Sequence, residues 1–157
     1  MVRKTLLSQQ KFETILNRLA CQLIEKHKDF QNTVLIGLQP RGIYLLNRLI
    51  SILEESYGIK NISHGKLDVT FFRDDFRRAE TILSPKSTKM DVIVENKLVV
   101  LIDDVLYTGR SIRAALTAID SFGRPNEIEL LVLIDRRFSR HLPIQPDYCG
   151  CQVDAIN

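Results

Sequence analysis

The sequence predicts an α/β fold in which a parallel sheet is covered by helices on both faces. Two observations indicate this fold class. First, apolar runs of strand length alternate along the chain with amphipathic segments of helical period. Second, the apolar runs at residues 34–36, 98–102 and 128–134 are continuous, as is typical of strands that both faces of a parallel sheet bury.

The first half of the chain supplies two helices and a strand. Apolar residues recur at helical spacing over residues 9–27, and Ser8 before them is a candidate N-cap. Residues 34–36 predict a short buried strand that Gly37 closes. Apolar residues of helical period over residues 43–58 predict the second helix.

The second half adds three strands, a loop and a helix. Alternation over residues 67–71 predicts a strand, and the charged, irregular residues 73–96 predict a long mobile loop that acts as a lid. Residues 98–102 predict the central strand, and residues 128–134 predict the last buried strand. A helix lies between them, and its expected core face consists of Ile112, Leu116, Ile119 and Phe122.

Composition excludes several classes of protein. The length of 157 residues predicts one domain, and 45% hydrophobic with 26% charged residues is typical of a soluble globular protein. No apolar run approaches the roughly 18 residues of a membrane span, and the N-terminus does not resemble a signal peptide. The three cysteines do not suit a disulfide framework, so we expect a cytoplasmic protein. A net charge of +3 permits a polyphosphate or RNA ligand without requiring one.

Residues 99–111 combine an apolar run, two adjacent carboxylates and a short loop before an amphipathic stretch. They predict a buried strand, a turn and a helix start, whose backbone N–H groups can hold a phosphate. Asp103 and Asp104 are expected at the carboxyl end of the strand, where parallel α/β sheets place their ligands. This combination suits a phosphorylated ribose. In the alternative interpretation the aspartates only end a strand and cap a helix, for which one Asp would suffice.

This segment resembles the 5-phosphoribosyl-1-diphosphate (PRPP) motif of type I phosphoribosyltransferases. Its form Asp-Asp-Val-Leu-Tyr-Thr-Gly-Arg resembles one branch more closely, the pyrimidine-operon attenuation regulator/uracil phosphoribosyltransferase family. The resemblance extends through most of the chain, at residues 37–45, 72–75, 123–125, 135–136, 142–144 and 147–148. It implies one phosphoribosyltransferase domain over residues 1–157 with a mobile hood loop. Members of the family continue into a further C-terminal strand, which this sequence does not include.

The resemblance also implies roles for the motif. Asp103 and Asp104 are expected to bind the ribose hydroxyls and to stabilise positive charge that develops on the ribose. The loop over residues 105–111 is expected to bind the 5′-phosphate, and its members are Val105, Leu106, Tyr107, Thr108, Gly109, Arg110 and Ser111. Mg²⁺ is the expected cofactor, held mainly by PRPP and water, so no protein ligand is assigned to it.

Two further segments are candidates for the diphosphate. Residues 37–42 contain Pro40, which lowers the cost of a cis peptide bond, and Arg41, whose guanidinium offers a fork for the leaving diphosphate. The resemblance makes Arg41 a catalytic candidate, whereas the motif alone also fits a plain turn with a solvated arginine. Arg73 opens the long loop and is expected to reach the diphosphate, although the charged residues around it also fit a solvated cluster.

The family places its base pocket near Asp135 and Arg136, with Arg136 contacting the nucleotide. Ordinary strand-end polarity is the alternative interpretation of this pair. The chain departs from many relatives in the following segment, residues 137–141, which lacks a glycine, carries one extra residue and has His141 where a carboxylate is common. This departure leaves the base specificity open.

Three functions follow in order of preference. The first is a uracil phosphoribosyltransferase that makes UMP and diphosphate from uracil and PRPP, combined in some relatives with attenuation of a pyrimidine operon. The second is mainly a UMP-sensing regulator that binds an mRNA leader and has weak catalysis. The third is a purine phosphoribosyltransferase. Basic residues available for RNA are Arg18, Lys26, Lys28, Arg137 and Arg140. No membrane partner is expected, and the resemblance implies a homodimer or a larger homo-oligomer.

Overall fold

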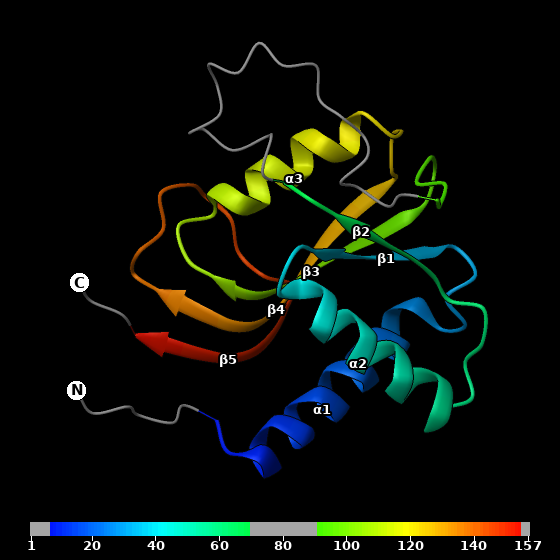
Figure 1. Ribbon diagram of the computed structural model, residues 1–157, viewed down its shortest axis with the longest axis horizontal. Helices are drawn as coiled ribbons and strands as arrows, with labels where there is room; N and C mark the ends of the chain where they lie inside the picture. The colour runs from blue at the N-terminus through cyan, green and yellow to red at the C-terminus, as the bar shows by residue number, and fades with distance from the viewer. Residues whose placement is uncertain (1–6, 70–90, 155–157) are drawn as a thin grey trace.

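A computed structural model describes residues 7–69 and 91–154 of the chain. They form one five-stranded sheet in the order β2-β1-β3-β4-β5, with every neighbouring pair parallel (Figure 1). The strands are β1 (Thr33–Leu38), β2 (Ser63–Leu67), β3 (Leu98–Leu106), β4 (Glu127–Arg137) and β5 (Tyr148–Asp154). The helices are α1 (Gln9–His27), α2 (Gly42–Glu55) and α3 (Arg110–Asp120).

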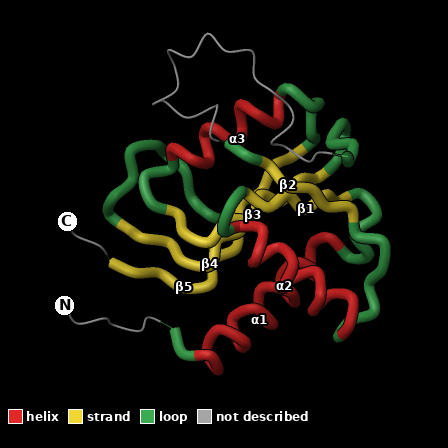
Figure 2. Tube along the Cα trace, in the orientation of Figure 1, coloured by secondary structure: helices red, strands yellow, loops and turns green. Residues whose placement is uncertain are grey.

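The helices cover the sheet from both sides, which confirms the predicted fold class. Helices α1 and α2 lie together on one face and α3 lies on the other (Figure 2). Each face has its own core: leucines of α1 and α2 pack on one side, and isoleucines and alanines of α3 pack on the other. Within the described ranges, none of these helices has the length and apolar character needed to cross a bilayer.

Helix α1 begins and ends as predicted, but β1, β3 and β4 are longer than their apolar runs. The Ser8 hydroxyl accepts a hydrogen bond from the N–H of Lys11 at 3.2 Å and caps α1. Strand β1 continues through Gly37 to Leu38, and β3 continues past its apolar run to Leu106. The pairing between β3 and β4 is maintained as far as Leu106, so backbone pairing rather than side-chain polarity sets the end of β3.

The prediction for the second strand was wrong in position. Strand β2 lies at Ser63–Leu67, earlier than residues 67–71, and pairs with β1 from Val34 to Leu38. β2 is an edge strand with exposed polar residues. Its buried position 65 is a glycine, so no apolar side chain there shows the alternation of buried and exposed residues. Residues 70 and 71 of the predicted strand lie outside the described residues.

The proposed hood loop over residues 73–96 also lies largely outside the described residues. Its described end is packed against the protein, since Val94 is fully buried in the core on the α3 side. The N–H of Asn96 donates to the carbonyl of Arg124 at 3.0 Å. Residues 91–96 therefore do not share the mobility predicted for the whole loop.

Helix α3 turns a different face to the sheet from the predicted one. Ile112 and Ile119 are buried as expected, but Leu116 and Phe122 are each 36% exposed. Ala115 and Ala118 fill the buried positions instead. Alanine is only weakly hydrophobic, so the larger leucine and phenylalanine side chains made the sequence predict the wrong buried face.

The sequence did not predict β5. Strand β4 is followed by this further strand, which forms the second edge of the sheet. At Gly150 an added Cβ would run into the carbonyl oxygen of Leu133 and the side chain of Ile15. A glycine here lets α1 approach β5 closely, and the guanidinium of Arg18 on α1 donates to the carbonyls of Cys149 and Gly150.

Candidate functional site

The described candidate residues gather at the carboxyl ends of β1, β3 and β4. Arg41 follows β1, the aspartates lie near the end of β3, and Arg136 lies near the end of β4. Open parallel sheets bind their ligands at this edge. Of the sequence candidates, Arg73 lies outside the described residues.

The two carboxylates of β3 are half-buried and adjacent. An oxygen of Asp103 accepts a hydrogen bond from the N–H of Asp104, and an oxygen of Asp104 accepts one from the N–H of Val105, both at 2.8 Å. Burial raises the pKa of the Asp103 carboxyl to about 7, and its hydrogen bond with the Asp104 carboxyl acts in the same direction. The guanidinium of Arg41 lies 3.9 Å from the other oxygen of Asp104. The pair therefore carries negative charge that its surroundings only partly balance.

The turn between β1 and α2 brings Arg41 to this pair. The peptide bond between Gln39 and Pro40 is cis, and the side chain of Arg41 is 79% exposed. A Cβ added at Gly42 would collide with the carbonyl oxygen of Ile102 in β3. Glycine at this position therefore allows α2 to begin directly against β3, one residue before the aspartates. This contact sets Arg41 beside Asp104.

The loop between β3 and α3 is shorter than the sequence predicted. Val105 and Leu106 belong to β3, while Arg110 and Ser111 already belong to α3, so only residues 107–109 connect them. Gly109 adopts a φ of 95°, in the left-handed region that favours glycine, and stands at the N-cap of α3. The Thr108 hydroxyl accepts a hydrogen bond from the N–H of Arg110 at 3.3 Å, and the following N–H groups of α3 and the positive end of its dipole suit an anion.

Two neighbouring cavities contain the predicted motif. One, of about 270 Å³, lies between the turn and the carboxylates and is lined by Leu38, Gln39, Pro40, Arg41, Val69, Asp103, Asp104, Val105, Tyr107 and Ser111. The other, of about 300 Å³, follows the loop and is lined by Asp103, Val105, Leu106, Tyr107, Thr108, Gly109, Arg110, Ser111 and Ile112. The turn, the carboxylates and the loop thus surround a continuous region with an anion-binding helix end beside it.

The end of β4 contacts the loop through two arginines. The guanidinium of Arg136 lies 4.1 Å from the centre of the Tyr107 ring, so it stacks on the loop. Arg140 forms an ion pair with the buried carboxylate of Asp135 at 2.7 Å and donates to the carbonyl of Tyr107, also at 2.7 Å. Sequence reasoning missed this role of Arg140, because nothing in the local pattern shows that the chain turns back onto the loop.

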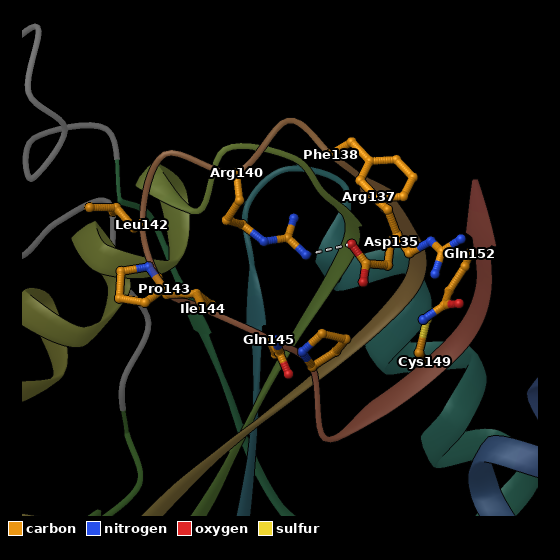
Figure 3. Close-up of a pocket in the computed structure, with 11 residues that line it drawn as sticks. Asp135, Arg137, Phe138, Arg140, Leu142, Pro143, Ile144, Gln145, Cys149 and Gln152 are labelled. Atoms are coloured by element: carbon orange, nitrogen blue, oxygen red, sulfur yellow. Dashed lines mark hydrogen bonds and ion pairs between the residues drawn. The ribbon is translucent and has the colours of Figure 1, made fainter. Parts of the chain in front are cut away.

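The segment in which the chain departs from its relatives forms one wall of a larger cavity of about 540 Å³ (Figure 3). Phe138 has a φ of 70° and is 68% exposed, and Arg137 beside it forms an ion pair with Asp154 at 2.7 Å. His141 contacts Arg110 of α3, with its Nδ1 3.4 Å from Nε of the arginine. His141 therefore lies against α3 beside the loop.

The carboxylates fit a divalent cation only as a partial ligand set. Across residues 7–69 and 91–154, no three His, Cys, Asp or Glu side chains converge as metal ligands would. Mg²⁺ accepts a small number of carboxylate oxygens and fills its remaining positions with substrate phosphate and water. Asp103 and Asp104 fit that role when a phosphorylated substrate supplies the other ligands.

Comparison with known proteins gives the family. Residues 2–156 match the model of the phosphoribosyl transferase domain. The chain belongs to this family. The match confirms the family resemblance drawn from the PRPP motif.

Relatives of this phosphoribosyltransferase narrow the branch. The chain is 46% identical over 145 residues to the bifunctional protein PyrR of Microcystis aeruginosa, covering 92% of this chain and 80% of that protein. It is 45% identical over 152 residues to the bifunctional protein PyrR of Halalkalibacterium halodurans, covering 96% and 83%. The branch predicted from the sequence is therefore confirmed.

Solved structures agree with the fold. A hypoxanthine phosphoribosyltransferase of Staphylococcus aureus matches with a TM-score of 0.74 at 21% identity, covering 99% of this chain and 81% of that one. A complex of the Leishmania tarentolae HGPRT-ase with GMP matches with a TM-score of 0.75 at 15% identity, covering 99% and 84%. At these identities the likeness concerns the fold alone.

Proposed function

We propose that this chain transfers the phosphoribosyl group of PRPP to uracil and produces UMP and diphosphate. A ring nitrogen of uracil bonds to the anomeric carbon of ribose while the bond from that carbon to diphosphate breaks, and the nitrogen loses its proton. Positive charge develops on the ribose, so the protein must position both ends of PRPP and stabilise that charge.

One observation carries the proposal: a carboxylate pair lies between a guanidinium and a helix N-terminus. Asp103 and Asp104 bind the ribose hydroxyls and lie close to the developing positive charge. The N–H groups at the start of α3 hold the 5′-phosphate, and Arg41 binds the leaving diphosphate. Mg²⁺ supplies the positive charge that allows the carboxylates and the polyphosphate to approach each other.

Arg136 serves the base end of the site in this proposal. Its guanidinium stacks on Tyr107, which lines both cavities, so Arg136 lies next to the site at the end of β4. The departing segment 137–141 lies beside it. Base choice is therefore the least constrained part of the proposal, and a purine phosphoribosyltransferase is the alternative.

A transfer assay with PRPP, Mg²⁺ and a panel of free bases tests the proposal. We expect UMP from uracil and little or no product from hypoxanthine, guanine or adenine. Product from a purine alone would favour the purine alternative, and no product from any base would reject transfer. Light scattering on the same sample tests the expected homodimer or larger assembly.

RNA attenuation is a second candidate function, because the relatives are bifunctional proteins of the PyrR type. The basic side chains available for RNA are mostly engaged in this structure. Arg18 bonds β5 carbonyls, and three of the other four candidates pair with carboxylates: Lys26 with Glu127 and Glu129, Arg137 with Asp154, and Arg140 with Asp135. RNA binding would have to exchange these partners, which weakens electrostatic attraction.

Filter binding with the leader RNA of a pyrimidine operon, with and without UMP, tests the regulator. We expect binding that depends on UMP and on RNA sequence, since a net charge of +3 gives little non-specific attraction. Equal binding of unrelated RNA, or no binding with UMP present, would reject regulation and leave the enzyme proposal intact.

A further inference from the structure

Residues 107–109 connect β3 to α3, and we call them the phosphate loop. Their backbone is hydrogen-bonded by the chain segment that follows β4. The guanidinium of Arg140 donates to the carbonyl of Tyr107 at 2.7 Å. The N–H groups of His141 and Leu142 donate to the carbonyl of Thr108 at 2.9 and 3.3 Å. Two successive loop carbonyls are therefore bound by residues 140–142.

These bonds fix the direction of the loop N–H groups. In a trans peptide unit the C=O and the N–H point in opposite directions. When the carbonyls of Tyr107 and Thr108 face residues 140–142, the N–H groups of Thr108 and Gly109 face away from that segment. The cavity of about 300 Å³ lies on that other side, because the loop lines it and residues 140–142 do not.

Arg140 is itself held in place by a buried carboxylate. Asp135, at the end of β4, is almost fully buried and its oxygen lies 2.7 Å from Nη2 of Arg140 (Figure 3). The Arg140 side chain is only 21% exposed. Both terminal nitrogens of the Arg140 guanidinium are hydrogen-bonded, Nη1 to the Tyr107 carbonyl and Nη2 to Asp135. The side chain therefore forms a rigid link between β4 and the loop.

We infer that Arg140 is a positioning residue that aims the loop N–H groups at the 5′-phosphate of the substrate. It touches no part of PRPP but acts through the carbonyl of Tyr107. This inference rests on the proposed function for the identity of the phosphate. It concerns the phosphate end of the substrate only, since Arg41 at the diphosphate end has no contact with this segment in the described structure.

Binding of two fragments of PRPP separates the ends of the site. Ribose 5-phosphate carries the phosphate that the loop holds, and Mg-diphosphate represents the leaving group. With Arg140→Gln we expect the Kd of ribose 5-phosphate to rise about tenfold or more, while the Kd of diphosphate stays within about twofold. In the transfer assay the KM for PRPP should rise more than kcat falls, because the substrate phosphate is bound in both ground and transition states.

Two companion variants sharpen the result. Arg140→Lys can restore one of the two contacts, so its affinity should fall between those of the wild type and Arg140→Gln. Arg137→Gln is the matched control, because it removes an arginine–carboxylate pair from the same segment without touching the loop. Circular dichroism and melting curves verify that each variant is folded.

Three outcomes would overturn the inference. One is an unchanged Kd of ribose 5-phosphate in folded Arg140→Gln. Another is an equal loss for diphosphate, which would mean general loosening of the site. The third is an equal effect of Arg137→Gln. A failure of the wild type to transfer to any base, with the fragment results as expected, would reject the proposed function and leave the positioning role of Arg140 in place.

Discussion

The two ends of the sheet treat buried carboxylates in opposite ways. At the carboxyl end, Asp103 and Asp104 lie side by side, and the guanidinium of Arg41 approaches only to 3.9 Å. At the amino end, a single carboxylate, that of Glu129 in β4, is surrounded by hydrogen-bond donors. Among the described residues, the carboxyl end compensates its negative charge only in part, whereas the amino end compensates it almost completely.

The amino-end network consists of Glu129 and the side chains around it. Nε2 of His27 and Nζ of Lys26 each lie 2.7 Å from a Glu129 oxygen, and the hydroxyl of Tyr148 donates to it at 3.0 Å. The other ring nitrogen of His27 is 2.7 Å from the hydroxyl of Thr33. Burial alone would raise the pKa of Glu129, but the hydrogen bonds from Lys26, His27 and Tyr148 outweigh burial and lower it.

The surroundings of the carboxylates differ between the two ends of the sheet, and so do their consequences. A satisfied network joins α1, β1, β4 and β5 and stabilises the folded chain. The carboxylate pair of β3 accepts backbone hydrogen bonds but has fewer charged partners than Glu129, so it remains available for a ligand that brings positive charge. Burial thus raises the pKa of Asp103 to about 7, whereas the hydrogen bonds around Glu129 lower the pKa of that carboxyl.

The largest effect is expected at the carboxyl end. Asp103→Asn combined with Asp104→Asn should lower the transfer rate by a factor on the order of 10² to 10³ or more, because charge stabilisation and ribose positioning are both lost. Steady-state kinetics on the folded double variant checks this. Near-normal turnover would remove the pair from the reaction.

The next effect is expected at the amino end and concerns stability. Glu129→Ala leaves the donors of His27, Tyr148 and Lys26 without their acceptor, so the free energy of unfolding should fall by about 3 kcal/mol. Urea unfolding measures it. Glu127→Ala is the matched control, because Glu127 contacts only Lys26 at the surface and its removal should cost about 0.5 kcal/mol or less. A loss as small for Glu129 as for Glu127 would contradict the contrast between the two ends.

A smaller effect separates the ligands of the carboxyl end. Arg41→Ala should weaken binding of PRPP and diphosphate about tenfold and leave UMP nearly unaffected, because UMP lacks the diphosphate. Isothermal titration with each ligand decides this. Equal losses for diphosphate and UMP would place Arg41 outside the leaving-group region.

The smallest effect is a difference in pH dependence. Asp103 has a folded-state pKa of about 7, above its value of about 4 in an unfolded chain, so the stability that its proton provides is complete below about pH 4 and is lost as pH rises through 7. The stability of Asp103→Asn relative to the wild type should therefore increase as pH rises from about 5 to about 8.

Glu129 should show the reverse sign. Its pKa is lowered by folding, so its contribution is present above the unfolded pKa and is lost as pH falls through the folded value. Unfolding curves of wild type, Asp103→Asn and Glu129→Gln from about pH 2 to about pH 8 check both signs. The same slope in all three proteins would mean that neither carboxylate titrates as described.

The sequence predicted those parts of the molecule best in which the chemistry of single residues indicates their place. The PRPP motif places Asp103, Thr108 and Gly109 by their chemistry, and the structure brings them to one edge of the sheet. Strand β5 was missed because an edge strand with Gly150 between two cysteines has neither an apolar run nor an alternation. Such strands are defined by pairing with a neighbour that sequence periodicity does not reveal.

The sequence predicted the residues of the candidate site but not the contacts that hold them in place. Arg41 and the aspartates could be named because each matches a ligand group, although their separation of 3.9 Å depends on the contact of Gly42 with β3. Arg140 looked like one more surface cation. Its contact with Tyr107 joins residues 33 positions apart, and no local rule predicts such a return of the chain.

Arg18 has a consequence for how copies of this chain behave together. It lies on α1, and its guanidinium occupies main-chain carbonyls of Cys149 and Gly150 on the edge strand β5. An uncovered edge offers such groups to strands of other molecules and promotes aggregation. Arg18 already bonds two carbonyl groups of β5 within the same chain, so these groups are less available to strands of other molecules.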